Sequence, residues 1–152
     1  DMTNNVYVTD VQKNLEKYLP LFKLIVNSNK YFDVNTLNYI AVVNNGNIDV
    51  GVIGIKIVSE DIMEVQLYQA PKVCRLSILS IIESTIPFIQ TLALTIKDVH
   101  YINMPIAYSF KLTSMFNNSF SKEEDKVIIP SKSILNLNIA SVTSKKIIIN
   151  SE

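Results

Sequence analysis

The spacing of apolar and polar residues changes several times along the chain. Strict alternation, which is typical of a strand with one buried face, runs through residues 62–69. Two runs rich in β-branched residues precede it, at 39–43 and 48–58, and Gly46 with the asparagines of 44–47 suits a tight turn between them. These residues predict three consecutive antiparallel strands joined by short turns.

Apolar residues that recur every three or four positions predict helices on either side of these strands. The longest stripe covers residues 73–96, where Pro87 should kink the helix or split it in two. A shorter stripe covers residues 11–26, with Asp10 as its N-cap and Pro20 as a break. Further runs predict strands at 6–9, 99–104, 127–129, 134–140 and 146–149, a helix within 105–120 and an exposed charged turn at 122–126.

The composition fits one packed domain. The chain has 152 residues, of which 48% are hydrophobic, so it can bury a core. The expected fold is a single α/β domain over residues 1–152, with a mixed, mostly antiparallel sheet flanked by helices. Lys and Arg number 14, as do Asp and Glu, and this balance argues against unspecific binding to nucleic acid. The abundance of Ile, Asn and Lys indicates an AT-rich genome, such as that of a virus or phage.

Scarce residue types exclude several kinds of site. Cys74 is the one cysteine and cannot form an internal disulfide, which suggests a reducing compartment such as the cytoplasm. With His100 as the one histidine, a zinc site of four nitrogen and sulfur ligands is excluded, and no metal is expected. Gly51 and Gly54, inside a predicted strand, indicate a bulge or the close approach of another group. No stretch has the unbroken apolar character of a signal core or a membrane span.

The spacing of three further residues is relevant to a candidate binding site. Pro71 ends the third predicted strand, Arg75 follows four residues later, and the strand after the long helix begins near Asp98. The segment 50–54 reads Val-Gly-Val-Ile-Gly, and 116–120 reads Phe-Asn-Asn-Ser-Phe. In these features and in the order of its elements the chain resembles the GNAT superfamily of N-acetyltransferases. In that family a strand leads into a pyrophosphate-binding turn, Arg/Gln-x-x-Gly-x-Gly/Ala, which opens a long helix, and a Tyr-x-x-x-Gly-Phe segment follows later.

The resemblance implies acetyl-CoA as a cofactor and a primary amine as its acceptor. Backbone amides at the helix start would hold the pyrophosphate. The cofactor-binding residues would be Gln69, Arg75, Leu76, Ser77 and Ile78. Glu64, on the strand before the turn, would act as a general base on the amine through water. Tyr108 is the candidate for the family's general-acid tyrosine.

Each of these candidates also has a plain structural interpretation. Arg75 is either a phosphate clamp or a surface residue whose stem covers the apolar stripe. Glu64 is either a general base or part of the solvated face of its strand. Cys74 is interpreted as a small buried thiol rather than a nucleophile, and His100 as a structural or exposed residue rather than a base.

Two functions therefore stay open. The predicted turn at 75–79 reads Arg-Leu-Ser-Ile-Leu where the family has glycines, and Met115 and Phe116 occupy the neighbourhood of its tyrosine. These departures favour a GNAT-like protein that has lost efficient acetyl-CoA binding and acts as a structural or interaction protein of a virus or phage. It would work through a protein partner or self-association, without nucleic acid or membrane. The alternative is an acetyl-CoA-dependent N-acyltransferase that acts on a primary amine.

Overall fold

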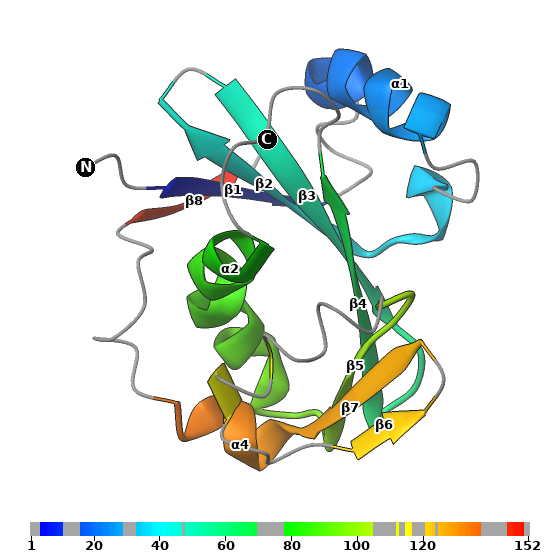
Figure 1. Ribbon diagram of the computed structural model, residues 1–152, viewed down its shortest axis with the longest axis vertical. Helices are drawn as coiled ribbons and strands as arrows, with labels where there is room; N and C mark the ends of the chain where they lie inside the picture. Colours follow the sequence, from blue (N-terminus) through cyan, green and yellow to red (C-terminus); the bar gives the residue numbers. More distant parts are fainter. Residues whose placement is uncertain are drawn as a thin grey trace.

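One mixed sheet organises the molecule (Figure 1). The computed structural model describes residues 4–10, 16–28, 33–46, 48–69, 78–104, 112, 115–116, 121–123, 125–137 and 146–150. Its strands are β1 (Asn4–Asp10), β2 (Tyr39–Asn45), β3 (Ile48–Ile57), β4 (Ile62–Gln69), β5 (Asp98–Tyr101), β6 (Ser121–Glu123), β7 (Lys126–Pro130) and β8 (Lys146–Asn150). They lie in the order β6-β7-β5-β4-β3-β2-β1-β8. The pairs β4·β5 and β1·β8 are parallel and the others antiparallel, which confirms the predicted mixed, mostly antiparallel sheet.

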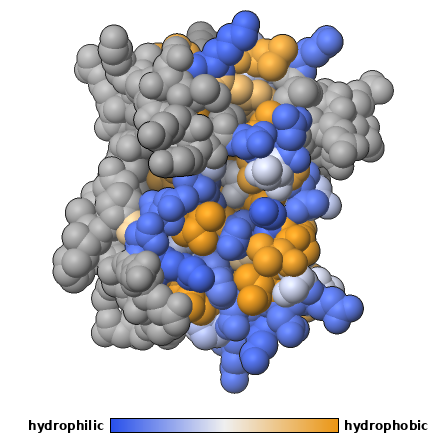
Figure 2. Space-filling model, turned by 90° about the vertical axis from the view of Figure 1, so that its right-hand side faces the viewer, coloured by the Kyte–Doolittle hydropathy of each residue, from blue (hydrophilic) through white to orange (hydrophobic). Residues whose placement is uncertain are grey.

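Helices cover both faces of this sheet. The α-helices are α1 (Leu19–Ser28), α2 (Ile78–Ala93) and α4 (Ser131–Leu135), and the 3-10 helices are η1 (Glu16–Tyr18) and η2 (Val34–Thr36). Figure 1 places α1 and α2 on opposite sides of the sheet. None of the helices in the described ranges is long and apolar enough to cross a membrane. On the side that faces right in Figure 1, exposed polar and apolar residues are interspersed (Figure 2).

Strand alternation divides the buried residues between two cores. On β4, Met63 and Val65 point to the α2 side and pack with Ile82, Ile86 and Ile89 of that helix. Tyr68 points to the other side, into a smaller core beneath α1. This second core also contains Phe22, Ile25, Ile40, Val42 and Val52. Because consecutive strand residues face opposite sides, the alternation predicted for 62–69 assigns Glu64, Gln66 and Tyr68 to the α1 face.

The two prolines expected to interrupt helices lie inside them. Pro20 is the second residue of α1, in the first turn, where a missing N–H leaves no intrahelical bond unmade. Pro87 lies within α2, which is continuous over Ile78–Ala93, so the prediction of a split there is wrong. An interior proline costs about 3 kcal/mol. Each buried isoleucine of the stripe contributes about 1.5–3 kcal/mol, so packing against the sheet outweighs that cost.

Two other predictions are corrected near the C-terminus. Residues 134–140 were expected as a strand, but Ser131–Leu135 is helix α4, packed against α2. The Gln90 side chain donates to the carbonyl oxygens of Ile134 (2.9 Å) and Leu137 (3.2 Å), which satisfies acceptors at the end of α4. The charged run 122–126 is not all turn, because Lys122 lies in β6 and pairs with Val127 of β7. The strand predicted at 146–149 is confirmed as β8.

Candidate functional site

The parallel strands β4 and β5 pair over four residues. Their register pairs Ile62 with Asp98 and ends with Val65 opposite Tyr101. The last bond between them joins the Ile102 N–H to the Val65 carbonyl oxygen at 2.9 Å. Main-chain groups of alternate residues in a strand point to the same neighbour, so those of Leu67 also point toward the β5 side. Within the described ranges no β5 residue pairs with β4 beyond Val65.

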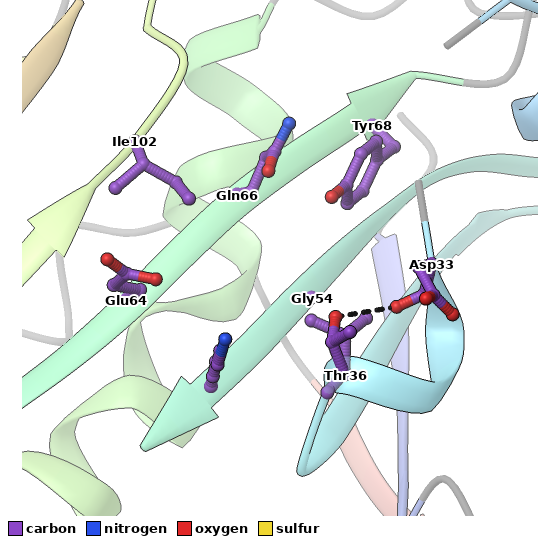
Figure 3. Close-up of a pocket in the computed structure, with 9 residues that line it drawn as sticks. Asp33, Thr36, Gly54, Glu64, Gln66, Tyr68 and Ile102 are labelled. Atoms are coloured by element: carbon purple, nitrogen blue, oxygen red, sulfur yellow. Dashed lines mark hydrogen bonds between the residues drawn. The ribbon is translucent and has the colours of Figure 1, made fainter. Parts of the chain in front are cut away.

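A pocket of about 120 Å³ lies next to the end of this pairing, on the α1 side of the sheet (Figure 3). Its walls come from four regions of the chain: the η2 segment, the two neighbouring strands β3 and β4, and the residue after β5. The lining residues are Asp33, Thr36, Leu37, Gly54, Lys56, Glu64, Gln66, Tyr68 and Ile102. Two carboxylates and one ammonium therefore surround a small cavity whose other walls are apolar or neutral.

Glu64 is the acidic residue that the sheet itself contributes to this pocket. It is half-buried, and it rises from the same face of β4 as Gln66 and Tyr68 (Figure 3). In the sheet register it lies opposite Lys56 of β3 on one side and His100 of β5 on the other. The prediction that Glu64 belongs to a functional site stays a prediction. His100 is half-buried and does not line the pocket.

Tyr68 is a lining residue that the sequence analysis did not select. Its side chain is only 6% exposed. Burial raises the pKa of its phenol to about 12, so the group keeps its proton at neutral pH and can donate a hydrogen bond. The signal that could have found it is the alternation of β4, which puts residues 64, 66 and 68 on one face.

The pKa of Tyr68 predicts a loss of stability in alkali. Between pH 10 and pH 12 an unfolded chain loses the phenol proton while the folded chain keeps it. The free energy of unfolding should therefore fall as the pH rises through this window. In Tyr68→Phe the fall should be shallower, with the remainder due to groups such as Tyr101, whose pKa burial also raises. Urea unfolding at a series of pH values measures the slope, and equal slopes for the two proteins would contradict the assignment.

The η2 segment forms a fixed wall of the pocket. Asp33 caps η2 by accepting a hydrogen bond from the Asn35 N–H at 3.0 Å, and the Thr36 hydroxyl donates to the Asp33 carbonyl oxygen at 2.8 Å. Asn38 then ties the segment to β3, because its N–H donates to the Ile55 carbonyl oxygen at 2.8 Å. These bonds hold Asp33 and Thr36 above the strands that carry Glu64.

Gly54 permits the close approach of this wall to the sheet. A Cβ at this position would lie 2.8 Å from Cδ1 of Leu37 and 3.4 Å from Cε2 of Tyr68. The close approach predicted from a glycine inside this strand is thus confirmed. Gly51 has its nearest contacts elsewhere, with the Tyr68 carbonyl oxygen at 3.3 Å and Ile81 at 3.5 Å.

Replacing Gly54 with valine should fill the pocket and displace η2. Overpacking of this kind costs about 1–3 kcal/mol of folding free energy. The matched control is Gly51→Ala, which adds its methyl group toward α2 and should leave the pocket open. Thermal unfolding gives the stability change, and a G54V protein as stable as the original would show that η2 does not need this approach.

The other predicted site residues are only partly covered by the structure. Arg75, Leu76, Ser77 and Tyr108 lie outside the described residues, as does Cys74. Gln69 is the last residue of β4 and Ile78 the first of α2, and the described structure includes their backbone but not their side chains. The proposed pyrophosphate turn, between these two residues, stays a prediction. Among the described residues, no three His, Cys, Asp or Glu side chains lie close enough together to hold a metal ion.

The fold can be compared with solved structures. No protein family and no curated protein matches the sequence. A mutant of the spermidine N-acetyltransferase SpeG from Vibrio cholerae matches with a TM-score of 0.57 over 88% of this chain and 97% of that chain, at 12% identity. GCN5 from Tetrahymena matches with a TM-score of 0.52 over 86% of this chain and 95% of that chain, at 10% identity. The chain has the GNAT fold.

This result confirms the predicted fold class. The pairing of β4 with β5 extends as far as Val65 and Tyr101, and Glu64 lines the pocket beside it.

Proposed function

We propose that this protein is an acetyl-CoA-dependent N-acyltransferase that acts on a primary amine. The observation that carries the proposal is the position of Glu64, which lines a small pocket where the pairing of β4 with β5 ends. The GNAT fold supports the class of reaction, and the spermidine N-acetyltransferase with the same fold acts on an amine.

The edge of β4 beyond Val65, which no described residue pairs, fits a ligand with amide groups. The main-chain N–H and C=O of Leu67 point away from β3, and hydrogen bonds to them would extend the sheet as a further strand does. The helix α2 begins at Ile78, and its first N–H groups form a region suited to a phosphate. Acetyl-CoA, when bound, supplies the activated acetyl group. The residues of this chain that would hold it are Leu67 and Gln69 on β4 and Ile78 at the start of α2.

The lining residues suit an amine substrate. Asp33 and Glu64 contribute two carboxylates against the one ammonium of Lys56, so the pocket attracts a cation. An ammonium must lose a proton before its nitrogen can attack a carbonyl carbon, and Glu64 is the group placed to accept that proton, directly or through water. Tyr68 keeps its proton at neutral pH, so it is not a candidate for the base. A cavity of about 120 Å³ admits the end of an amine chain.

Steady-state assays test this proposal. The protein is incubated with acetyl-CoA and a panel of amines, namely spermidine, a lysine-containing peptide and an amino sugar, and released thiol is measured. Turnover with at least one amine is expected, together with calorimetric binding of acetyl-CoA. The proposal would be refuted if acetyl-CoA gave neither heat of binding nor a thermal shift, and if no amine led to thiol release.

A GNAT-like scaffold without efficient cofactor binding is the second candidate. It is favoured by the side chains in the sequence at 75–79, where the family has glycines that let backbone amides approach a pyrophosphate. Such a protein would act through a protein partner or by self-association. Light scattering and affinity capture measure both, and turnover with any amine would exclude this candidate.

A further inference from the structure

A second pocket, of about 310 Å³, lies on the α1 side of the sheet, away from the first. It is lined by Tyr7, Lys17, Tyr18, Asn44 and Asp49. Both pockets use β3, but the first uses the end of this strand and the second its beginning. They have no lining residue in common. The volume of the second pocket is at the lower end of the range of small-molecule sites.

A β-bulge gives this pocket its acidic wall. The register of β2 and β3 shifts between Val43 and Asn44, so that Val43 lies opposite Gly51 but Asn44 lies opposite Asp49. Bulges of this kind redirect side chains. The Asn44 Nδ2 donates a hydrogen bond to Asp49 Oδ1 at 3.1 Å. This bond holds the carboxylate in place through one oxygen and leaves Oδ2 for another donor.

Lys17 is the basic residue of this pocket, and two aromatic rings hold its side chain in place. Lys17 lies in η1, and its Nζ is 5.4 Å from the ring centroid of Tyr18 and 5.9 Å from that of Tyr7. Both distances are within the range of cation–π attraction. The rings therefore confine an otherwise exposed ammonium to the rim of the cavity.

Lys17 and Asp49 line the same cavity, yet no ion pair joins them to each other or to another residue of the described ranges. The pocket thus presents two separate charges of opposite sign. A ligand with a single charge would be attracted by one of these residues and repelled by the other. A ligand with both charges satisfies both at once.

We propose that this second pocket binds a small zwitterion, a free amino acid or ω-amino acid. Its carboxylate contacts the Lys17 ammonium and its own ammonium contacts the Asp49 carboxylate. The aliphatic part lies against the tyrosine rings. The proposal does not depend on the acyltransferase function, because it uses none of the residues of the first pocket.

Binding is measured without acetyl-CoA by amide chemical shifts and calorimetry. The probes are glycine, β-alanine and γ-aminobutyrate, which increase the separation of the two charges in steps. N-acetylated γ-aminobutyrate lacks the positive charge, and γ-aminobutyramide lacks the negative one. One of the three zwitterions is expected to bind about tenfold more tightly than either singly charged analogue, as the loss of one charge-assisted hydrogen bond implies. Equal binding of the analogues, or no binding of any zwitterion, would overturn the proposal.

Variants then assign the binding to this pocket. Lys17→Met and Asp49→Asn should each weaken zwitterion binding about tenfold. Lys23→Met, at an exposed position on α1 that lines neither pocket, is the matched control and should leave the affinity unchanged. The double variant Lys17→Asp, Asp49→Lys swaps the positions of the two charges. It should restore binding, with the zwitterion in the opposite orientation. If the two single variants bind as the original protein does, the zwitterion lies elsewhere and the proposal is wrong.

Discussion

Replacing Glu64 with glutamine is expected to lower kcat for acetyl transfer by about a hundredfold to ten-thousandfold, the usual contribution of a general base. Glutamine keeps the shape of the side chain in the pocket but cannot accept the proton of the amine. Acetyl-CoA binding should be unchanged, because the cofactor slot at the edge of β4 does not use this side chain. Initial rates at saturating amine, with calorimetry of cofactor binding, measure both quantities.

The pH dependence separates a base from a merely structural residue. If Glu64 removes the proton, raising the pH should partly rescue E64Q, because solvent then supplies neutral amine. Glu60→Gln, in the exposed turn between β3 and β4, is the matched control and should keep full activity. An E64Q protein with more than half of the original kcat would show that Glu64 is not the base. A variant that also loses cofactor binding would show that the residue supports the fold of the site.

Replacing Ile89 with alanine is expected to destabilise the protein by about 2–5 kcal/mol, the range for a large aliphatic residue removed from a core. Ile89 is fully buried where α2 packs on the sheet. The loss of folding free energy has two parts. The deleted apolar atoms no longer contribute their burial, and a cavity remains because the continuous helix cannot move to fill it. Urea unfolding followed by circular dichroism measures it, with the slope m as a check on two-state behaviour.

The control for this substitution lies just beyond the end of the same helix. Leu94 is 72% exposed, so Leu94→Ala should change the free energy of unfolding by no more than about 0.5 kcal/mol. Ile89→Val should lower the free energy of unfolding by an intermediate amount, about 0.5–1.5 kcal/mol. If Leu94→Ala cost as much as Ile89→Ala, the apolar stripe of α2 would not be the main contact with the sheet.

The elements that the sequence predicted well are those whose signal is local. Strand β4 has the predicted bounds, Ile62–Gln69, because strict alternation and the turns on either side depend only on residues close together in the sequence. Gly46 has φ 66°, as the predicted hairpin turn requires. Glu64 was selected from its place on this strand, and it lines the first pocket.

The errors occur where distant contacts outweigh local preference. Pro87 does not split α2, because the helix gains more from its contact with the sheet than the proline costs. Ile134 lies in a short helix rather than a strand, since α4 packs on α2 and its end accepts hydrogen bonds from Gln90. Tyr68 was missed because its burial and its raised pKa come from α1 and from the neighbouring strands.

By itself, the sequence determined the meander, the long apolar helix and the set of β4 residues that share a face with Glu64. These follow from periodicity, which depends only on the geometry of one segment. Only the tertiary structure decided that this face lies under η2, that β5 pairs with β4 as far as Val65, and that β8 joins the edge of β1. Such choices depend on packing between residues far apart in the chain, where the burial of whole faces outweighs any local preference.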